Sequence, residues 1–138
     1  MLPKPGHIRT YTEFTFEAAH RVEGVSPLHG HTFVVRMDFS GPPDPTFGWP
    51  VNLHEVNRSF KRVLKAIGQA DGNGDGEGEG DLTLIPEIGI GSLENIAKWI
   101  WGMMKPHHPE LLSIDLNRGF RGSVEGCVYY GTAEDMAS

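Results

Sequence analysis

Three histidines are spaced so that a single metal ion could bind all of them. His20 ends an alternating segment, and His29 and His31 flank Gly30. Residues two apart on a strand point to the same face and lie about 7 Å apart. We expect the intervening glycine to leave room for the ion and the third imidazole to come from a neighbouring strand. Three protein ligands leave one zinc position open for water or substrate, as in catalytic zinc sites.

Two alternating segments must position these histidines. Residues 10–20 and 31–39 each place apolar side chains at every second position, in phase with His20 and His31. A period of two predicts antiparallel strands whose buried faces lead into the histidine cluster. The apolar residues that share these faces are Phe14, Phe16, Ala18, Phe33, Val35, Met37 and Phe39.

The rest of the chain predicts two helices and two more strands. Apolar residues recur at helical spacing over 52–67, where Asn52 can cap the helix and Gly68 can end it. A second helix is expected from Ser92 to Met104.

Strands are expected over 111–117 and 123–130. The order β-β-α-α-β-β predicts an α+β fold, with a four-stranded antiparallel sheet and two helices on one face.

The length of 138 residues fits one domain, 1–138. A glycine-rich and acidic insert at 69–81 has no apolar face, so we expect a mobile loop there. Residues 71–76 begin like a calcium-binding loop, but Leu82 stands where a bidentate glutamate belongs. The sequence therefore does not favour calcium binding.

Composition excludes several classes of partner. The net charge is −6 and lysine and arginine do not cluster, so nucleic acid is not an expected partner. No apolar run approaches the roughly 20 residues that span a bilayer, and no secretion signal is expected. Cys127 is the only cysteine, which favours a reducing, cytoplasmic setting.

The sequence also predicts the burial or exposure of three further side chains. Cys127 should be a small buried hydrophobe within a strand. His107 and His108 lie between two prolines, so both are expected to be exposed in a turn.

Segments 16–21, 28–33 and 93–97 together resemble the 6-pyruvoyltetrahydropterin and 6-carboxytetrahydropterin synthase family. The resemblance implies the tunnelling fold, in which monomers join edge to edge into a trimeric barrel and two trimers commonly stack into a hexamer. It also implies that His20, His29 and His31 bind Zn²⁺. The implied substrate is 7,8-dihydroneopterin triphosphate, from which triphosphate is eliminated while the side chain rearranges.

The chain departs from the family pattern at the expected catalytic positions. The family's catalytic cysteine lies four to six residues before the paired histidines, where this chain has Val25 and Glu23. Some members carry a glutamate instead, so the resemblance gives Glu23 the role of base. The family's Asp-His pair aligns with Asp81 and Leu82, which keeps a supporting aspartate and loses the histidine.

Arg118 stands where the resemblance places a pterin-anchoring glutamate. A guanidinium only donates hydrogen bonds, so it suits a carboxylate, phosphate or carbonyl group of the substrate. Two hypotheses follow. One is a zinc-dependent lyase or aldolase of the pterin synthase type. The other is a non-catalytic or altered-specificity paralogue that binds metal and pterin. A purely structural oligomer subunit fits the retained histidines less well.

Overall fold

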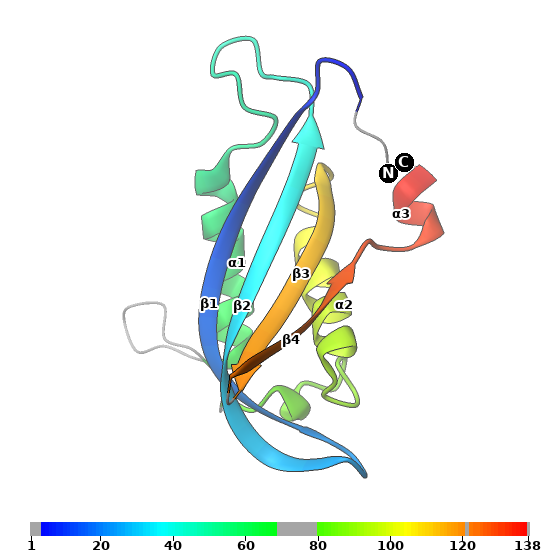
Figure 1. Cartoon of the computed structure of the whole chain (residues 1–138). Coiled ribbons are helices and arrows are strands. Elements are labelled where there is room, and N and C mark those ends of the chain that lie inside the picture. The colour runs from blue at the N-terminus through cyan, green and yellow to red at the C-terminus, as the bar shows by residue number, and fades with distance from the viewer. Residues whose placement is uncertain (1–3, 69–79, 121, 138) are drawn as a thin grey trace.

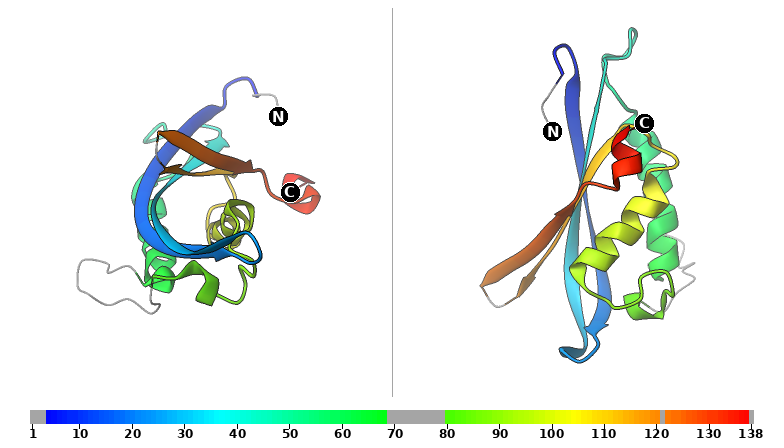
Figure 2. Two further views of the ribbon diagram at one scale, coloured as in Figure 1. Left: turned by 60° about the horizontal axis from the view of Figure 1, so that its bottom comes forward. Right: turned by 90° about the vertical axis from the view of Figure 1, so that its right-hand side faces the viewer.

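The structure, a computed structural model, describes residues 4–68, 80–120 and 122–137. One antiparallel sheet has the strand order β1-β2-β3-β4, and two long helices lie against one of its faces (Figures 1 and 2). The α+β prediction is confirmed, including the order β-β-α-α-β-β. The strands are β1 (Ile8–Val22), β2 (Ser26–Gly41), β3 (Leu111–Phe120) and β4 (Ser123–Tyr129). The helices are α1 (Leu53–Ile67), η1 (Leu82–Leu84), α2 (Leu93–Met104) and α3 (Ala133–Ala137).

The core lies between the sheet and the two long helices. The predicted inward face of β2 is fully buried, and α1 and α2 contribute apolar stripes against it. Burial of this area supplies the main favourable free energy of folding, at roughly 25 cal/mol per Å² of apolar surface. The fully buried core residues of these three elements include Phe33, Val35, Met37, Phe39, Val56, Phe60, Val63, Ile96, Ile100 and Met104.

The predicted helix ends are confirmed. The Asn52 side chain accepts a hydrogen bond from the backbone N–H of His54 at 2.9 Å, which caps α1. Gly68 ends that helix with φ at 102°, a left-handed conformation that glycine adopts readily. The Ser92 hydroxyl caps α2 by accepting from the backbone N–H of Asn95 at 3.2 Å.

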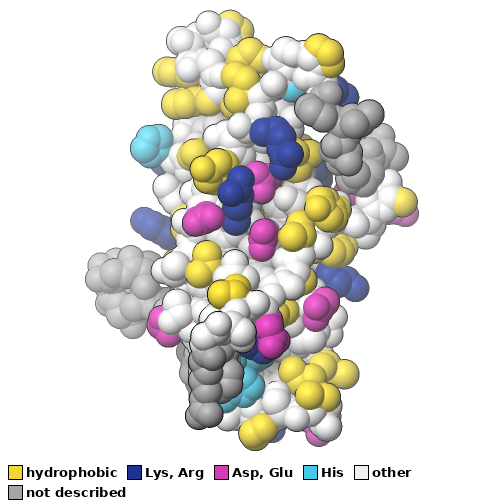
Figure 3. Space-filling model, viewed as in Figure 1, with side chains coloured by type: hydrophobic (Ala, Val, Ile, Leu, Met, Phe, Trp, Pro, Cys, Tyr) yellow, Lys and Arg dark blue, Asp and Glu magenta, His cyan; other side chains and the backbone are white. Residues whose placement is uncertain are grey.

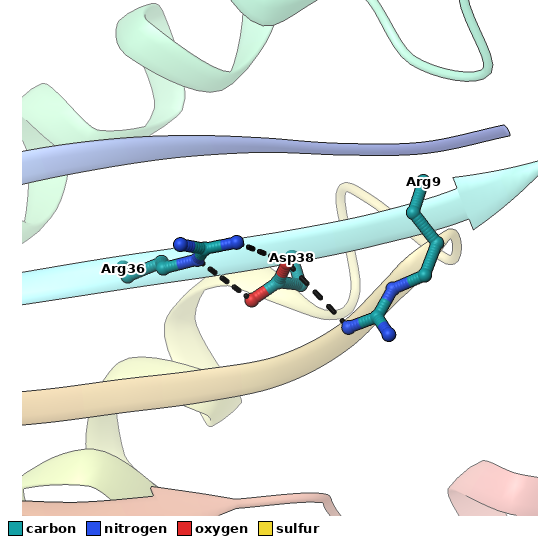
Figure 4. A network of polar contacts seen from close by, with 3 residues as sticks. All are labelled: Arg9, Arg36 and Asp38. Carbon is teal, nitrogen blue, oxygen red and sulfur yellow. Dashed lines mark hydrogen bonds and ion pairs between the residues drawn. The ribbon is translucent and has the colours of Figure 1, made fainter. Parts of the chain in front are cut away.

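The sheet face opposite the helices carries charged side chains, which gather on the near side of the space-filling view (Figure 3). Asp38, only 7% exposed, lies between Arg36 and Arg9 (Figure 4). The Nε of Arg36 donates to the Oδ2 of Asp38 at 3.2 Å, and the Nη2 of Arg9 lies 3.6 Å from the Oδ1 of Asp38. Two guanidinium groups therefore compensate the charge of this buried carboxylate.

The structure differs from the sequence predictions in several places. β1 and β2 extend to Val22 and back to Ser26, beyond the predicted 10–20 and 31–39. The short helices η1 and α3 were outside the predicted set. His107 is exposed as expected, but His108 is only 6% exposed, so its predicted exposure is wrong. Its ring packs edge-on to the ring of Phe39 in the core, at 6.2 Å between centroids.

The glycine-rich insert lies outside the described residues over 69–79, and the calcium-like run 71–76 falls entirely within that gap. Gly80 and Asp81, which end the predicted loop, are described. Within the described ranges, no helix is both long enough and apolar enough to cross a bilayer.

Candidate metal centre

The pairing of β1 with β2 brings the three predicted histidines together. His20 lies directly opposite His29, and His31 follows two residues later on the same face of β2. Their candidate ligand nitrogens all lie within 4.8 Å of one another. Ring centroids are 4.7 Å apart for His20 and His29, 5.1 Å for His20 and His31, and 4.5 Å for His29 and His31. The predicted cluster is therefore present at the end of the β1–β2 hairpin.

Backbone carbonyls orient two of these rings. The Nδ1 of His20 lies 2.7 Å from the carbonyl oxygen of Gly91, and the Nδ1 of His29 lies 2.6 Å from that of Pro27. An Nδ1–H that donates to a carbonyl leaves Nε2 with its lone pair, the form in which histidine binds metals. The Nε2 of His20 is buried and makes no hydrogen bond to any described residue. A metal ion would satisfy that nitrogen.

Gly91 reaches the first histidine because it has no side chain. A Cβ at this position would lie 2.6 Å from the carbonyl oxygen of Arg21 and 2.8 Å from the Cγ2 of Thr83. The segment is also fixed from the helix side, since the Nδ2 of Asn95 donates to the carbonyl of Ile90 at 2.9 Å. Sequence reasoning missed this carbonyl, for which the only local signal is a pair of glycines shortly before α2.

The expected role of Gly30 is wrong. Strand alternation points this position to the opposite face of β2 from both neighbouring imidazoles. A Cβ at Gly30 would meet only the carbonyl oxygen of Ala18, at 3.8 Å, which is ordinary contact. The space between the rings therefore comes from the pairing of two strands and not from the glycine.

Burial keeps two of the rings neutral. Desolvation is the main cause that lowers the pKa of His20, and the hydrogen bond to Gly91 opposes it. For His31 desolvation again acts first and the positive charge of Arg118 second, which together lower its pKa to about 4. Both imidazoles are therefore neutral at pH 7, as metal binding requires.

The donor set fits a divalent transition metal. Imidazole nitrogens suit zinc, copper, iron and nickel, and three of them leave an open coordination position. The buried, unbonded Nε2 of His20 supports this fit.

Two other residues that the sequence assigns to the site, Arg118 and Asp81, lie beside the histidine cluster. Arg118 on β3 pairs with Phe33 of β2 and therefore shares its face of the sheet, and its Nη2 donates to Glu125 on β4 at 3.1 Å. Asp81 lies near enough to His20 to act on its pKa. Sequence reasoning missed Glu125, whose only signal is its place in the alternation of β4.

The carboxylate of Asp81 already has partners in η1. It accepts from the backbone N–H of Thr83 at 2.9 Å and from the hydroxyl of the same residue. A hydrogen bond from the Ala19 N–H to the carbonyl of Gly80, at 2.6 Å, fixes this segment against β1. The aspartate therefore caps a 3₁₀ helix at the rim of the cluster.

Glu23 lies apart from the imidazoles, in the turn that joins β1 to β2. Its side chain is exposed, and the turn is closed by a hydrogen bond from the N–H of Val25 to the carbonyl of Val22 at 2.9 Å. Gly24 adopts a φ of 78° there. The structure thus brings Arg118 and Asp81 to the cluster and leaves Glu23 on the hairpin tip.

Comparisons with known proteins agree with this architecture. Residues 9–129 match the sequence model of the family described as 6-pyruvoyl tetrahydropterin synthase. The Caenorhabditis elegans 6-pyruvoyl tetrahydropterin synthase structure is similar, with a TM-score of 0.71 and 19% identity over 96% of this chain and 100% of that one. The Plasmodium falciparum synthase has a TM-score of 0.53 and 15% identity, over 91% of this chain and 99% of that one.

A third similar structure is a Plasmodium vivax 6-pyruvoyltetrahydropterin synthase, with a TM-score of 0.55 and 13% identity over 90% of this chain and 98% of that one. It is a variant in which a glutamate, described as a catalytic residue, is replaced by cysteine. These structures share the tunnelling fold with the chain. The sequence model covers most of its length, and the chain therefore belongs to the 6-pyruvoyl tetrahydropterin synthase family.

Proposed function

We propose that the chain is a zinc-dependent enzyme of the 6-pyruvoyl- or 6-carboxytetrahydropterin synthase type. Its substrate would be 7,8-dihydroneopterin triphosphate or a related pterin. The observation that carries the proposal is the orientation of His20, whose Nδ1 donates to a backbone carbonyl while its buried Nε2 faces two more imidazoles. Family membership supports a pterin as the class of substrate.

The chemistry divides between the ion and the chain. Bound zinc would polarise a hydroxyl or carbonyl of the substrate side chain and so acidify the adjacent C–H. Glu23 would take up the released proton as general base. A glutamate in a catalytic role has a precedent in the Plasmodium vivax relative. Asp81 would hold negative charge beside His20, and Arg118 would bind a polar or anionic group of the substrate.

We also propose that the single domain 1–138 works as a cytoplasmic homo-oligomer, a trimer or hexamer. β1 and β4 form the two edges of the sheet, and exposed edges invite pairing with another chain. Apolar side chains on β4 are also exposed, with Val124 at 71% and Val128 at 45%. Pairing of β4 with β1 of a second copy would cover both edges.

The alternative function is a metal- and pterin-binding paralogue without catalysis. Two observations favour it: the Asp81 carboxylate already caps η1, and Glu23 is exposed on the hairpin turn.

Turnover separates the two functions. The zinc-loaded protein is incubated with 7,8-dihydroneopterin triphosphate, and release of triphosphate is followed with time. Release that is lost in His29→Ala and in Glu23→Ala supports the enzyme. Saturable pterin binding without release, measured by quenching of pterin fluorescence, supports the paralogue. A protein that binds neither zinc nor pterin contradicts both.

A further inference from the structure

We propose that Arg118 makes the metal centre selective for anionic oxygen ligands. In this arrangement Arg118 attracts the anion, and Glu125 partly neutralises the guanidinium charge. The inference rests on the proposed metal binding. It narrows the substrate to one that presents a carboxylate, phosphate or other oxyanion to the centre.

The position of Arg118 follows from strand register. It lies opposite Phe33, whose ring centroid is 5.5 Å from that of His20 and 5.8 Å from that of His31. His31 is two residues from Phe33 on the same face, so it is a diagonal neighbour of Arg118 across the strand pair. Long side chains reach such diagonal neighbours. The Arg118 side chain is 17% exposed, so its charge is largely withdrawn from water.

Glu125 compensates this charge only in part. Its Oε2 lies 3.1 Å from the Nη2 of Arg118, but its side chain is 64% exposed and water screens it. The Arg118 side chain, by contrast, lies largely buried beside the imidazoles, so water screens its charge less. The positive member of the pair therefore dominates at the cluster.

A net positive charge near the cluster has opposite effects on a bound metal ion and on an anion that binds beside it. The three imidazoles bind metal as neutral groups, so they do not offset the charge of the ion. Arg118 repels the cation and attracts an anion that joins it. Removal of the guanidinium charge must therefore strengthen metal binding and weaken anion binding, and removal of the Glu125 charge must do the reverse.

Acetate and acetamide test the inference, because they have nearly the same shape and differ in charge. Metal affinity of the whole chain is measured by titration with Co²⁺, and binding of each probe is followed through the visible absorption of the cobalt-loaded protein. The variants are Arg118→Gln and Glu125→Gln. Arg58→Gln is the control for net charge, since that side chain is 74% exposed on α1.

We expect Arg118→Gln to bind Co²⁺ roughly tenfold more tightly and acetate roughly tenfold more weakly, as for one partly screened charge. Glu125→Gln should shift both affinities the other way by a smaller factor, and Arg58→Gln should change neither. Acetamide affinity should stay constant throughout. If Arg118→Gln weakens acetate and acetamide alike, the residue donates a hydrogen bond to neutral groups and the inference is overturned.

The variants also distinguish this inference from the proposed function. One outcome is that the unsubstituted protein binds Co²⁺ normally while neither variant changes metal affinity and acetate affinity in opposite directions. That result overturns the anion selectivity and leaves the metal binding standing. Failure of the unsubstituted protein to bind Co²⁺ and Zn²⁺ overturns both. Because Glu125 is exposed, its substitution leaves the fold intact, and it keeps the inference testable if Arg118→Gln does not fold.

Discussion

Two histidines at opposite ends of the sheet are similarly buried, but their Nε2 atoms have different partners. His20 is 2% exposed and His108 is 6% exposed, and burial is the main cause that lowers the pKa of each. The Nε2 of His108 lies 2.8 Å from the hydroxyl of Ser59 on α1. The Nε2 of His20 makes no hydrogen bond to a described residue and faces His29 and His31.

The comparison shows that burial and a lowered pKa do not by themselves identify a functional imidazole. Such shifts also occur in structural positions, where the ring completes a core and its nitrogens are satisfied. A shallow pocket beside His108 even adds titratable side chains, among them Asp44, Glu55 and Glu110. What sets the His20 end apart is a nitrogen that lacks a partner and lies within reach of two others.

Substitution of one histidine at each end of the sheet should give the largest difference. His20→Ala should abolish measurable zinc binding, because a direct ligand contributes more than the roughly 10–100-fold of an outer-shell partner. His108→Ala should lower the free energy of unfolding by about 1–3 kcal/mol and leave the zinc affinity unchanged. Zinc titration and urea unfolding of both variants test this. Equal zinc affinities in the two variants would contradict the assignment of the site.

The next largest effect should come from the carbonyl that orients His20. Gly91→Ala places a Cβ 2.6 Å from the carbonyl oxygen of Arg21, so the segment must move and the hydrogen bond to the imidazole must lengthen. We expect a 10–100-fold loss of zinc affinity.

Gly102→Ala on α2 is the matched control. A Cβ there meets nothing within 4 Å, so it should stabilise the helix by about 0.5–1 kcal/mol and keep zinc affinity. Zinc titration of both variants is the measurement. An unchanged affinity in Gly91→Ala would show that the carbonyl does not orient the ring.

Acidification should weaken the metal-free fold through His31. Its pKa is about 4 in the folded chain and about 6.5 when unfolded, so the unfolded state binds the proton first. The stability that the neutral His31 contributes is fully present above pH 6.5 and is lost as the pH falls toward 4. The charged groups acting on the ring are Arg118, His29 and His20, which lower its pKa, and Glu125, which raises it. Urea unfolding of the chelator-treated protein at pH 7 and 5 tests this, and His31→Ala should show a smaller difference.

Local patterns in the sequence are sufficient for most of the fold and for the histidine cluster. The period of two aligns His20 with Phe16, and the spacing of His29 and His31 puts both on one face. Helix ends follow from Asn52 and Gly68, whose roles depend on residues within one turn. These features depend on neighbours along the chain.

The missed features depend on approach between distant segments. The hydrogen bond from His20 to Gly91 joins residues 71 positions apart, and no periodicity carries that information. Glu125 meets Arg118 only because β3 and β4 pair in that register. His108 was expected to be exposed because two prolines predict a turn, but this turn packs onto α1 and the end of β2.

The smallest predicted effect concerns the hydrogen bond between Ser59 and His108. Ser59→Ala removes the hydroxyl partner of His108, and a buried nitrogen that loses its hydrogen bond costs about 1 kcal/mol of stability. Zinc affinity should not change, because Ser59 and His108 lie at the far end of the sheet from His20. Urea unfolding and zinc titration of the same preparation measure both quantities. A fall in zinc affinity without loss of stability would mean that the two ends of the sheet are coupled. The contrast between satisfied and unsatisfied imidazoles would then no longer support the candidate metal site at His20.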